Sequence, residues 1–190
     1  MSISHKRQVL DRLKSGANMT GMRLKLSGTE QGLTTVVSTT ISGADSPELV
    51  RESIIHLFPD FPDQTAIEPI FPSENLVSWQ AENISLATLL DAIHEQRILD
   101  TALDYMSKSL NSDSTTFYIL RQASIRGKVA FPVGDINELG GVIKIEISGP
   151  NLDQWLEAAT WHEGRDVVPR KIGDELTMTE DGDPVTWIQD

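Results

Sequence analysis

The sequence predicts a single α+β domain over residues 31–161, with flexible extensions at both ends. Some segments are rich in Val, Ile and Thr and alternate in polarity, which is typical of strands packed on one face. Others repeat apolar side chains at helical spacing. The strand-like segments are 33–41, 115–123 and 142–147, and the helix-like segments are 47–58, 85–93 and 99–110. A chain of 190 residues with 39% hydrophobic residues is long enough to bury one such core.

The net charge of −12 is unevenly distributed along the chain. Residues 82–131 carry five basic and six acidic groups and are nearly neutral, whereas residues 151–190 carry three basic and ten acidic groups. A strongly basic nucleic-acid footprint is therefore absent. The chain has no cysteine, which excludes disulfides and thiolate metal sites, and no apolar run long enough to span a bilayer. We expect a cytoplasmic protein with no membrane partner.

Both ends of the chain are expected to lie outside the packed domain. Residues 1–30 combine basic side chains with glycine spacing that rarely supports packed structure, so we predict a flexible N-terminal extension. A basic arm that grips RNA is the alternative interpretation. Residues 162–190 are predicted to form an acidic, mostly extended tail.

The first half of the domain contains a strand, a capped helix and two short strand candidates. The run Ser46-Pro47-Glu48 offers an N-cap, a proline at the first helical position and an acid in the first turn, which predicts a helix from Pro47 to about Phe58. Residues 66–71 and 76–81 flank a turn at 72–75 and are candidate strands of a hairpin.

The next helical segment changes phase part-way along. After a cap at Ser85, the apolar stripe of residues 86–93 faces the opposite way from the stripe of residues 99–110. A continuous helix would place Arg97 and Asp100 on the core side, where an unpaired charge is costly. We expect a break or sharp bend at residues 94–97. The alternative is a helix covered on both sides whose charges are paired.

The clearest strand candidate is residues 115–123, which places Phe117 and Arg121 on one face and Tyr118 and Gln122 on the other. Residues 125–131 are predicted to return as its hairpin partner. Residues 142–147 follow as a strand with one polar face, and a short helix is expected to begin at Asn151 or Asp153.

The sequence contains no recognisable catalytic or metal-binding motif. His94-Glu95 resembles the start of a zinc-protease helix signature, but the position four residues after His94 is Ile98. Gly140-Gly141 precedes a strand, so these glycines lack the helix N-terminus that binds phosphate. We expect no catalytic residue, no metal site and no cofactor.

Polar residues near the predicted hairpin allow two interpretations. In the first, Arg97 and Asp100 pair with each other or with Gln122 and fasten the helix to the sheet. In the second, basic side chains line a groove for RNA phosphates, and Tyr118 or Phe117 stacks on bases. The RNA-binding candidates are Arg97, Arg121, Gln122, Arg126, Lys128 and Tyr118.

Three runs carry a resemblance to a known family: residues 96–102, 115–123 and 127–131. They resemble motifs of an archaeal family of uncharacterised proteins of the UPF0201 type, described as RNA-binding. The resemblance implies an antiparallel sheet backed by helices, a fold like large-subunit ribosomal protein five, and neither cofactor nor assigned catalytic residue.

The expected function is therefore a non-catalytic RNA- or ribonucleoprotein-binding module, with structured RNA or ribosomal components as partners. The alternative is a protein-interaction module that uses edge strands and the acidic tail to bind a basic partner. An enzyme is the third option, with a pocket that gathers Arg97, Asp100 and Gln122. The sequence leaves the oligomeric state open.

Overall fold

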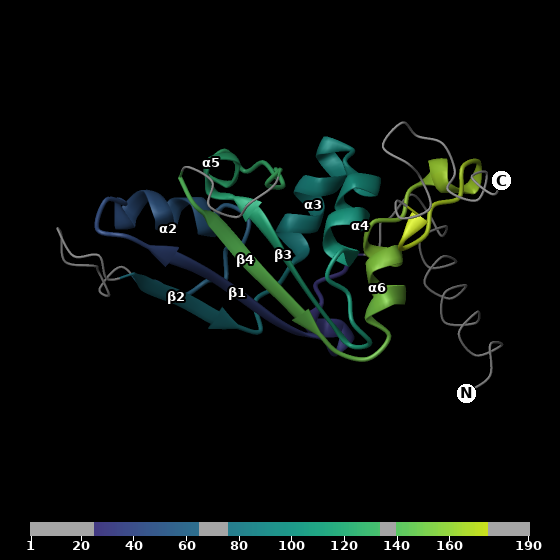
Figure 1. The fold of residues 1–190 in the computed structure, drawn as a ribbon, viewed down its shortest axis with the longest axis horizontal. Helices are drawn as coiled ribbons and strands as arrows, with labels where there is room; N and C mark the ends of the chain where they lie inside the picture. The colour runs from purple at the N-terminus through teal and green to yellow at the C-terminus, as the bar shows by residue number, and fades with distance from the viewer. Residues whose placement is uncertain (1–24, 65–75, 134–139, 175–190) are drawn as a thin grey trace, which may run out of the picture.

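A computed structural model describes residues 25–64, 76–133 and 140–174 of the chain. Within them, helices pack on one four-stranded antiparallel sheet, which confirms the predicted α+β class (Figure 1). The likeness to ribosomal protein five stays a prediction. The strands are β1 (Thr34–Ile41), β2 (Val77–Glu82), β3 (Ser114–Leu120) and β4 (Val142–Ser148), and the helices are η1 (Thr29–Gln31), α2 (Pro47–Ile55), α3 (Ala87–Gln96), α4 (Leu99–Ser107), α5 (Arg121–Ser124), α6 (Leu152–Ala159) and η2 (Glu163–Asp166).

The strand order is β2-β1-β4-β3, and each neighbouring pair is antiparallel. Because side chains alternate along a strand, the register separates the sheet into two faces. On one face Trp79 lies opposite Thr39, and Phe117 lies opposite Ile145. On the other face Tyr118 lies opposite Lys144, which lies opposite Ser38.

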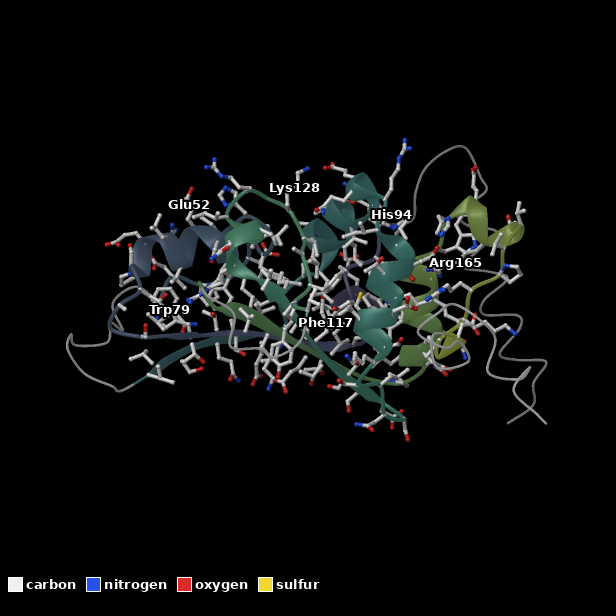
Figure 2. The ribbon with its side chains drawn as sticks, turned by 45° about the horizontal axis from the view of Figure 1, so that its top comes forward. Glu52, Trp79, His94, Phe117, Lys128 and Arg165 are labelled. Carbon is white, nitrogen blue, oxygen red and sulfur yellow. The ribbon has the colours of Figure 1, made fainter. Side chains whose placement is uncertain are left out.

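The helices cover the apolar face of the sheet. Figure 1 shows α2 and α5 over one end of the sheet and α3, α4 and α6 toward the other. Trp79 and Phe117, both labelled in Figure 2, are buried on this face. The largest fully buried side chains are Trp79, Phe58, Ile41, Ile54, Leu57, Leu86, Leu89, Ile93, Leu103, Met106, Ile119 and Ile143. The opposite sheet face carries mainly polar residues, among them Thr40, Lys144 and Glu146, together with Val36, Leu120 and Val142.

Several local predictions are confirmed. Helix α2 begins at Pro47, and the Ser46 hydroxyl accepts a hydrogen bond from the amide of Leu49. The helix break predicted at residues 94–97 is also present. Helix α3 ends at Gln96, Arg97 adopts a left-handed conformation with φ 57°, and α4 begins at Leu99. The candidate strand at 66–71 lies outside the described residues.

The predicted hairpin of residues 115–123 with 125–131 is wrong. Strand β3 ends at Leu120, the chain turns into the single-turn helix α5, and the ladder partner of β3 is β4. Leu120 bonds through its amide to the Ala130 carbonyl, but no ladder follows. At this turn Arg121 enters the interior and bonds to residues of other elements.

Packed residues also lie outside the range 31–161. Leu26 is buried, and the η1 turn follows it. After α6, the segment 160–174 lies against α4, with Arg165 bonded to Asp100 and Arg170 bonded to Asp104. Because Asp100 and Asp104 are one helical turn apart on α4, the two arginines fasten this segment along the helix.

Candidate functional site

Arg121, expected to contact RNA, is buried and structural. Its side chain is only 7% exposed. Its Nε donates to the Gly140 carbonyl at 2.6 Å, its Nη1 to the Thr40 carbonyl at 3.4 Å, and its Nη2 to Asp45 Oδ1 at 3.1 Å. Burial lowers the pKa of Arg121, and the Asp45 carboxylate partly offsets that effect. The guanidinium therefore joins the ends of β1 and β4 and is unavailable to a phosphate.

The two glycines before β4 make room for this arrangement. A Cβ on Gly141 would lie 2.0 Å from Arg121 Nη2, and one on Gly140 would lie 2.6 Å from Gln122 Nε2. Both glycines also have positive φ angles, 87° and 74°, which other residues rarely adopt. Gly140-Gly141 thus has a packing role at the buried arginine.

Three other candidates gather at one edge of the helical layer. The Gln96 side chain donates from Nε2 to the Val129 carbonyl at 2.9 Å and accepts from the Val129 amide at 2.6 Å. This double hydrogen bond, which we call the Gln96 clamp, connects the end of α3 to the loop after α5. Arg97 directly follows Gln96 in the sequence, and Lys128 directly precedes Val129. Arg126 lies in the same loop. We call Arg97, Arg126 and Lys128 the basic rim.

All three side chains of the basic rim belong to exposed residues. Figure 2 shows Lys128 at the surface between Glu52 of α2 and His94 of α3. Among the described residues, every arginine except Arg97 and Arg126 forms a salt bridge. The rim is therefore a place where exposed guanidinium groups have no carboxylate partner within the described part of the chain.

Tyr118 and Gln122 do not join the rim. Tyr118 lies on the sheet face that the helices leave open, beside Lys144. Lys144 forms a half-exposed ion pair with Glu146, at 3.0 Å. Gln122 is exposed in α5 and its side chain lies against Gly140. The predicted candidate set is thus divided among an interior position, the rim and the open sheet face.

The predicted pairing of Arg97 with Asp100 is also wrong. Asp100 accepts hydrogen bonds from Arg165 Nε at 2.9 Å and faces His162 Nε2 at 3.1 Å. Burial raises the pKa of Asp100, but the bonds from Arg165 and His162 outweigh burial and hold the pKa below its ordinary value. Arg165 was missed because its segment is acidic and lacks helical or strand periodicity.

Both edges of the sheet are partly occupied. On β2, the Gln64 side chain donates to the Gln80 carbonyl and accepts from the Gln80 amide, as a neighbouring strand would. On β3, residues 130 and 111 bond to the main chain at Leu120 and Ser114. Among the described residues, the edge main chain is thus occupied at Gln80 of β2 and at both ends of β3, which limits strand addition by a partner at these positions.

The chain is similar to archaeal UPF0201 proteins. One from Aeropyrum pernix is 27% identical over 151 residues, which cover 77% of this chain and 99% of the relative. Another from Methanothermobacter thermautotrophicus is 27% identical over 116 residues, 61% of this chain and 82% of the relative.

The likeness extends to the fold. A crystal structure of an uncharacterized UPF0201 protein matches with a TM-score of 0.53 at 25% identity, over 65% of this chain and 90% of that one. No protein-family model matches the chain. The names of these relatives state no substrate or reaction.

Within residues 25–64, 76–133 and 140–174, no group of three or more His, Asp or Glu side chains is placed to hold a metal ion. No helix in these ranges is long and apolar enough to cross a membrane.

Proposed function

We propose that the protein is a non-catalytic, cytoplasmic module that binds structured RNA through the basic rim. The observation that carries the proposal is that Arg97, Arg126 and Lys128 are exposed, unpaired within the described residues, and held near one another by the Gln96 clamp. Phosphate contacts from arginine and lysine supply most of the affinity of nucleic-acid binding that reads no sequence. A three-residue rim predicts weak, salt-sensitive binding of this kind.

The backbone at Arg97 is consistent with a functional role. A non-glycine residue in the left-handed region is strained, at a cost of roughly 1–2 kcal/mol. Helices commonly end in this conformation with glycine, which adopts it freely. An arginine at this position contributes an exposed cation that glycine would not, and this supports a role for its charge.

The proposal predicts a specific salt dependence for a triple variant, Arg97/Arg126/Lys128→Ala. Each phosphate contact contributes roughly 0.7–0.9 to the slope of log affinity against log salt concentration, so loss of three contacts should flatten the slope by about 2–3. Titration of a labelled RNA hairpin between low and moderate salt would measure both slopes.

The matched control removes three exposed cations that belong to other parts of the chain: Lys25, Lys108 and Lys171→Ala. Lys25 precedes η1, Lys108 follows α4 and Lys171 lies in the C-terminal segment, so none belongs to α3, to α5 or to the loop that follows α5. The control variant should keep nearly the full slope. Equal slopes for the two triple variants would show that net charge alone drives binding and would exclude the rim as a site.

A single change, Arg97→Gly, should separate stability from binding. Glycine relieves the left-handed strain but brings its own entropic cost of roughly 0.5–1 kcal/mol, so the free energy of unfolding should rise by up to about 1.5 kcal/mol. RNA affinity should fall at the same time because one phosphate contact is lost. Urea unfolding and RNA titration of the same preparation test this; unchanged affinity would remove Arg97 from the proposed site.

A further inference from the structure

The open face of the sheet contains a shallow depression of about 530 Å³ near the ends of β1, β3 and β4. Its lining combines an aromatic ring, an ammonium group and several hydroxyls. It is separate from the basic rim, which belongs to the helical side. The lining residues are Ser38, Thr39, Thr40, Ser42, Asp45, Leu76, Tyr118, Gly141, Val142 and Lys144.

The sheet register sets the spacing of the chemically useful groups. Tyr118 on β3, Lys144 on β4 and Ser38 on β1 occupy one row across neighbouring strands. Directly opposite side chains lie within about 5.5 Å at their Cβ atoms, so the ring, the ammonium group and the hydroxyl fit within the length of one nucleotide. The Tyr118 hydroxyl has no hydrogen-bond partner within the described residues, and its residue is partly exposed.

Lys144 is the cationic residue of the lining and the group that an anionic ligand would contact. Asp45 is the acidic residue of the lining, and it is held by the buried Arg121, whose guanidinium lies directly behind Gly141. Lys144 pairs with Glu146, but both side chains are half-exposed, and such pairs contribute little stability. The ammonium group can therefore turn from Glu146 toward a phosphate, against the repulsion of that half-exposed carboxylate.

We propose that this depression binds a ribonucleotide with an unpaired base, which stacks on Tyr118 while its phosphate bonds to Lys144. Aromatic side chains on open sheets bind bases in this way because every base offers a flat π-face. The hydroxyl of the exposed Thr40 supplies a donor and an acceptor for the sugar. The inference extends the proposed RNA function to single-stranded segments, and it uses a different surface, so either proposal can fail alone.

The test is titration of the full chain with labelled oligouridylate and with uridine monophosphate at low salt. Tyr118→Ala should weaken oligouridylate binding about tenfold or more, because stacking is lost. Tyr118→Phe should bind as the unchanged protein does, since it keeps the ring and no hydrogen bond is lost. Lys144→Gln should weaken binding and reduce its salt dependence.

The rim triple variant distinguishes this site from the proposed function. It should lose affinity for the RNA hairpin while keeping the Tyr118-dependent part of oligouridylate binding. Binding of the monophosphate comparable to that of the oligomer would identify a free-nucleotide site, and preference for the oligomer would identify an RNA strand. Absence of binding to both probes, or equal binding by Tyr118→Ala and Tyr118→Phe, would overturn the inference.

Discussion

Replacing Arg121 by alanine is expected to lower the free energy of unfolding by about 2–4 kcal/mol. The change removes donors to the carbonyls of Gly140 and Thr40 and to Asp45, and it leaves a cavity at the junction of β1 and β4. Charged hydrogen bonds contribute more than neutral ones, and buried acceptors without donors carry a further cost. Equilibrium unfolding in urea would measure the loss.

Two further variants test the same junction from both sides. Arg121→Lys should recover only part of the stability, because one ammonium group cannot bond in three fixed directions. Gly141→Ala should destabilise as well, since its Cβ would lie 2.0 Å from the guanidinium at a φ of 74°. If Arg121→Ala instead left stability unchanged and reduced RNA affinity, the residue would belong to the binding surface after all.

The elements of this fold are well predicted where local chemistry determines them. The cap at Ser46 with Pro47 places the start of α2, and the alternation of Val142–Ser148 places β4. The break at Arg97 follows from apolar phase alone, because a continuous helix would bury charged side chains. Each of these features depends on neighbours within about two turns or one strand of the chain.

The incorrect predictions involve partners far apart in sequence. The turn at Arg121 depends on Thr40 and Asp45, which lie 81 and 76 residues away, so the strand pattern of 115–123 appears to continue where the structure turns. Contacts distant in sequence also explain why the predicted site residues lie in three separate places. Alternation separates Tyr118 from Arg121, but no local pattern reveals that Gln96 holds Arg97 beside the loop of Lys128.

The second large effect is expected for Arg165→Ala, which should lower the free energy of unfolding by about 2–3 kcal/mol. Arg165 is buried between α4 and α6 and donates to Asp100, to the Leu99 carbonyl and to Thr160 Oγ1. Figure 2 shows it at the end of the molecule formed by α6 and the segment that follows. Because segment 160–174 is fastened there, the loss should also make this segment cleavable by protease.

Asp100, which accepts a hydrogen bond from Arg165, makes the free energy of unfolding depend on pH. Its pKa is lower in the folded protein than in the unfolded chain, so its stabilising contribution is present above about pH 4 and is lost as the pH falls through the folded pKa. Asp100→Asn should flatten this part of the stability profile. Because Asp100 is 45% exposed, the effect should be smaller than that of Arg165→Ala.

A double-mutant cycle with Arg165→Ala and Asp100→Asn separates the ion pair from the other bonds of Arg165. If the pair dominated, the double variant would be about as stable as Arg165→Ala, and the pH dependence would vanish in both single variants. The burial of Arg165 against main-chain carbonyls favours the other result: most of its effect should persist when Asp100 is already asparagine. A coupling energy near the full effect of Arg165→Ala would contradict that expectation and make the ion pair the main fastening of the segment to α4.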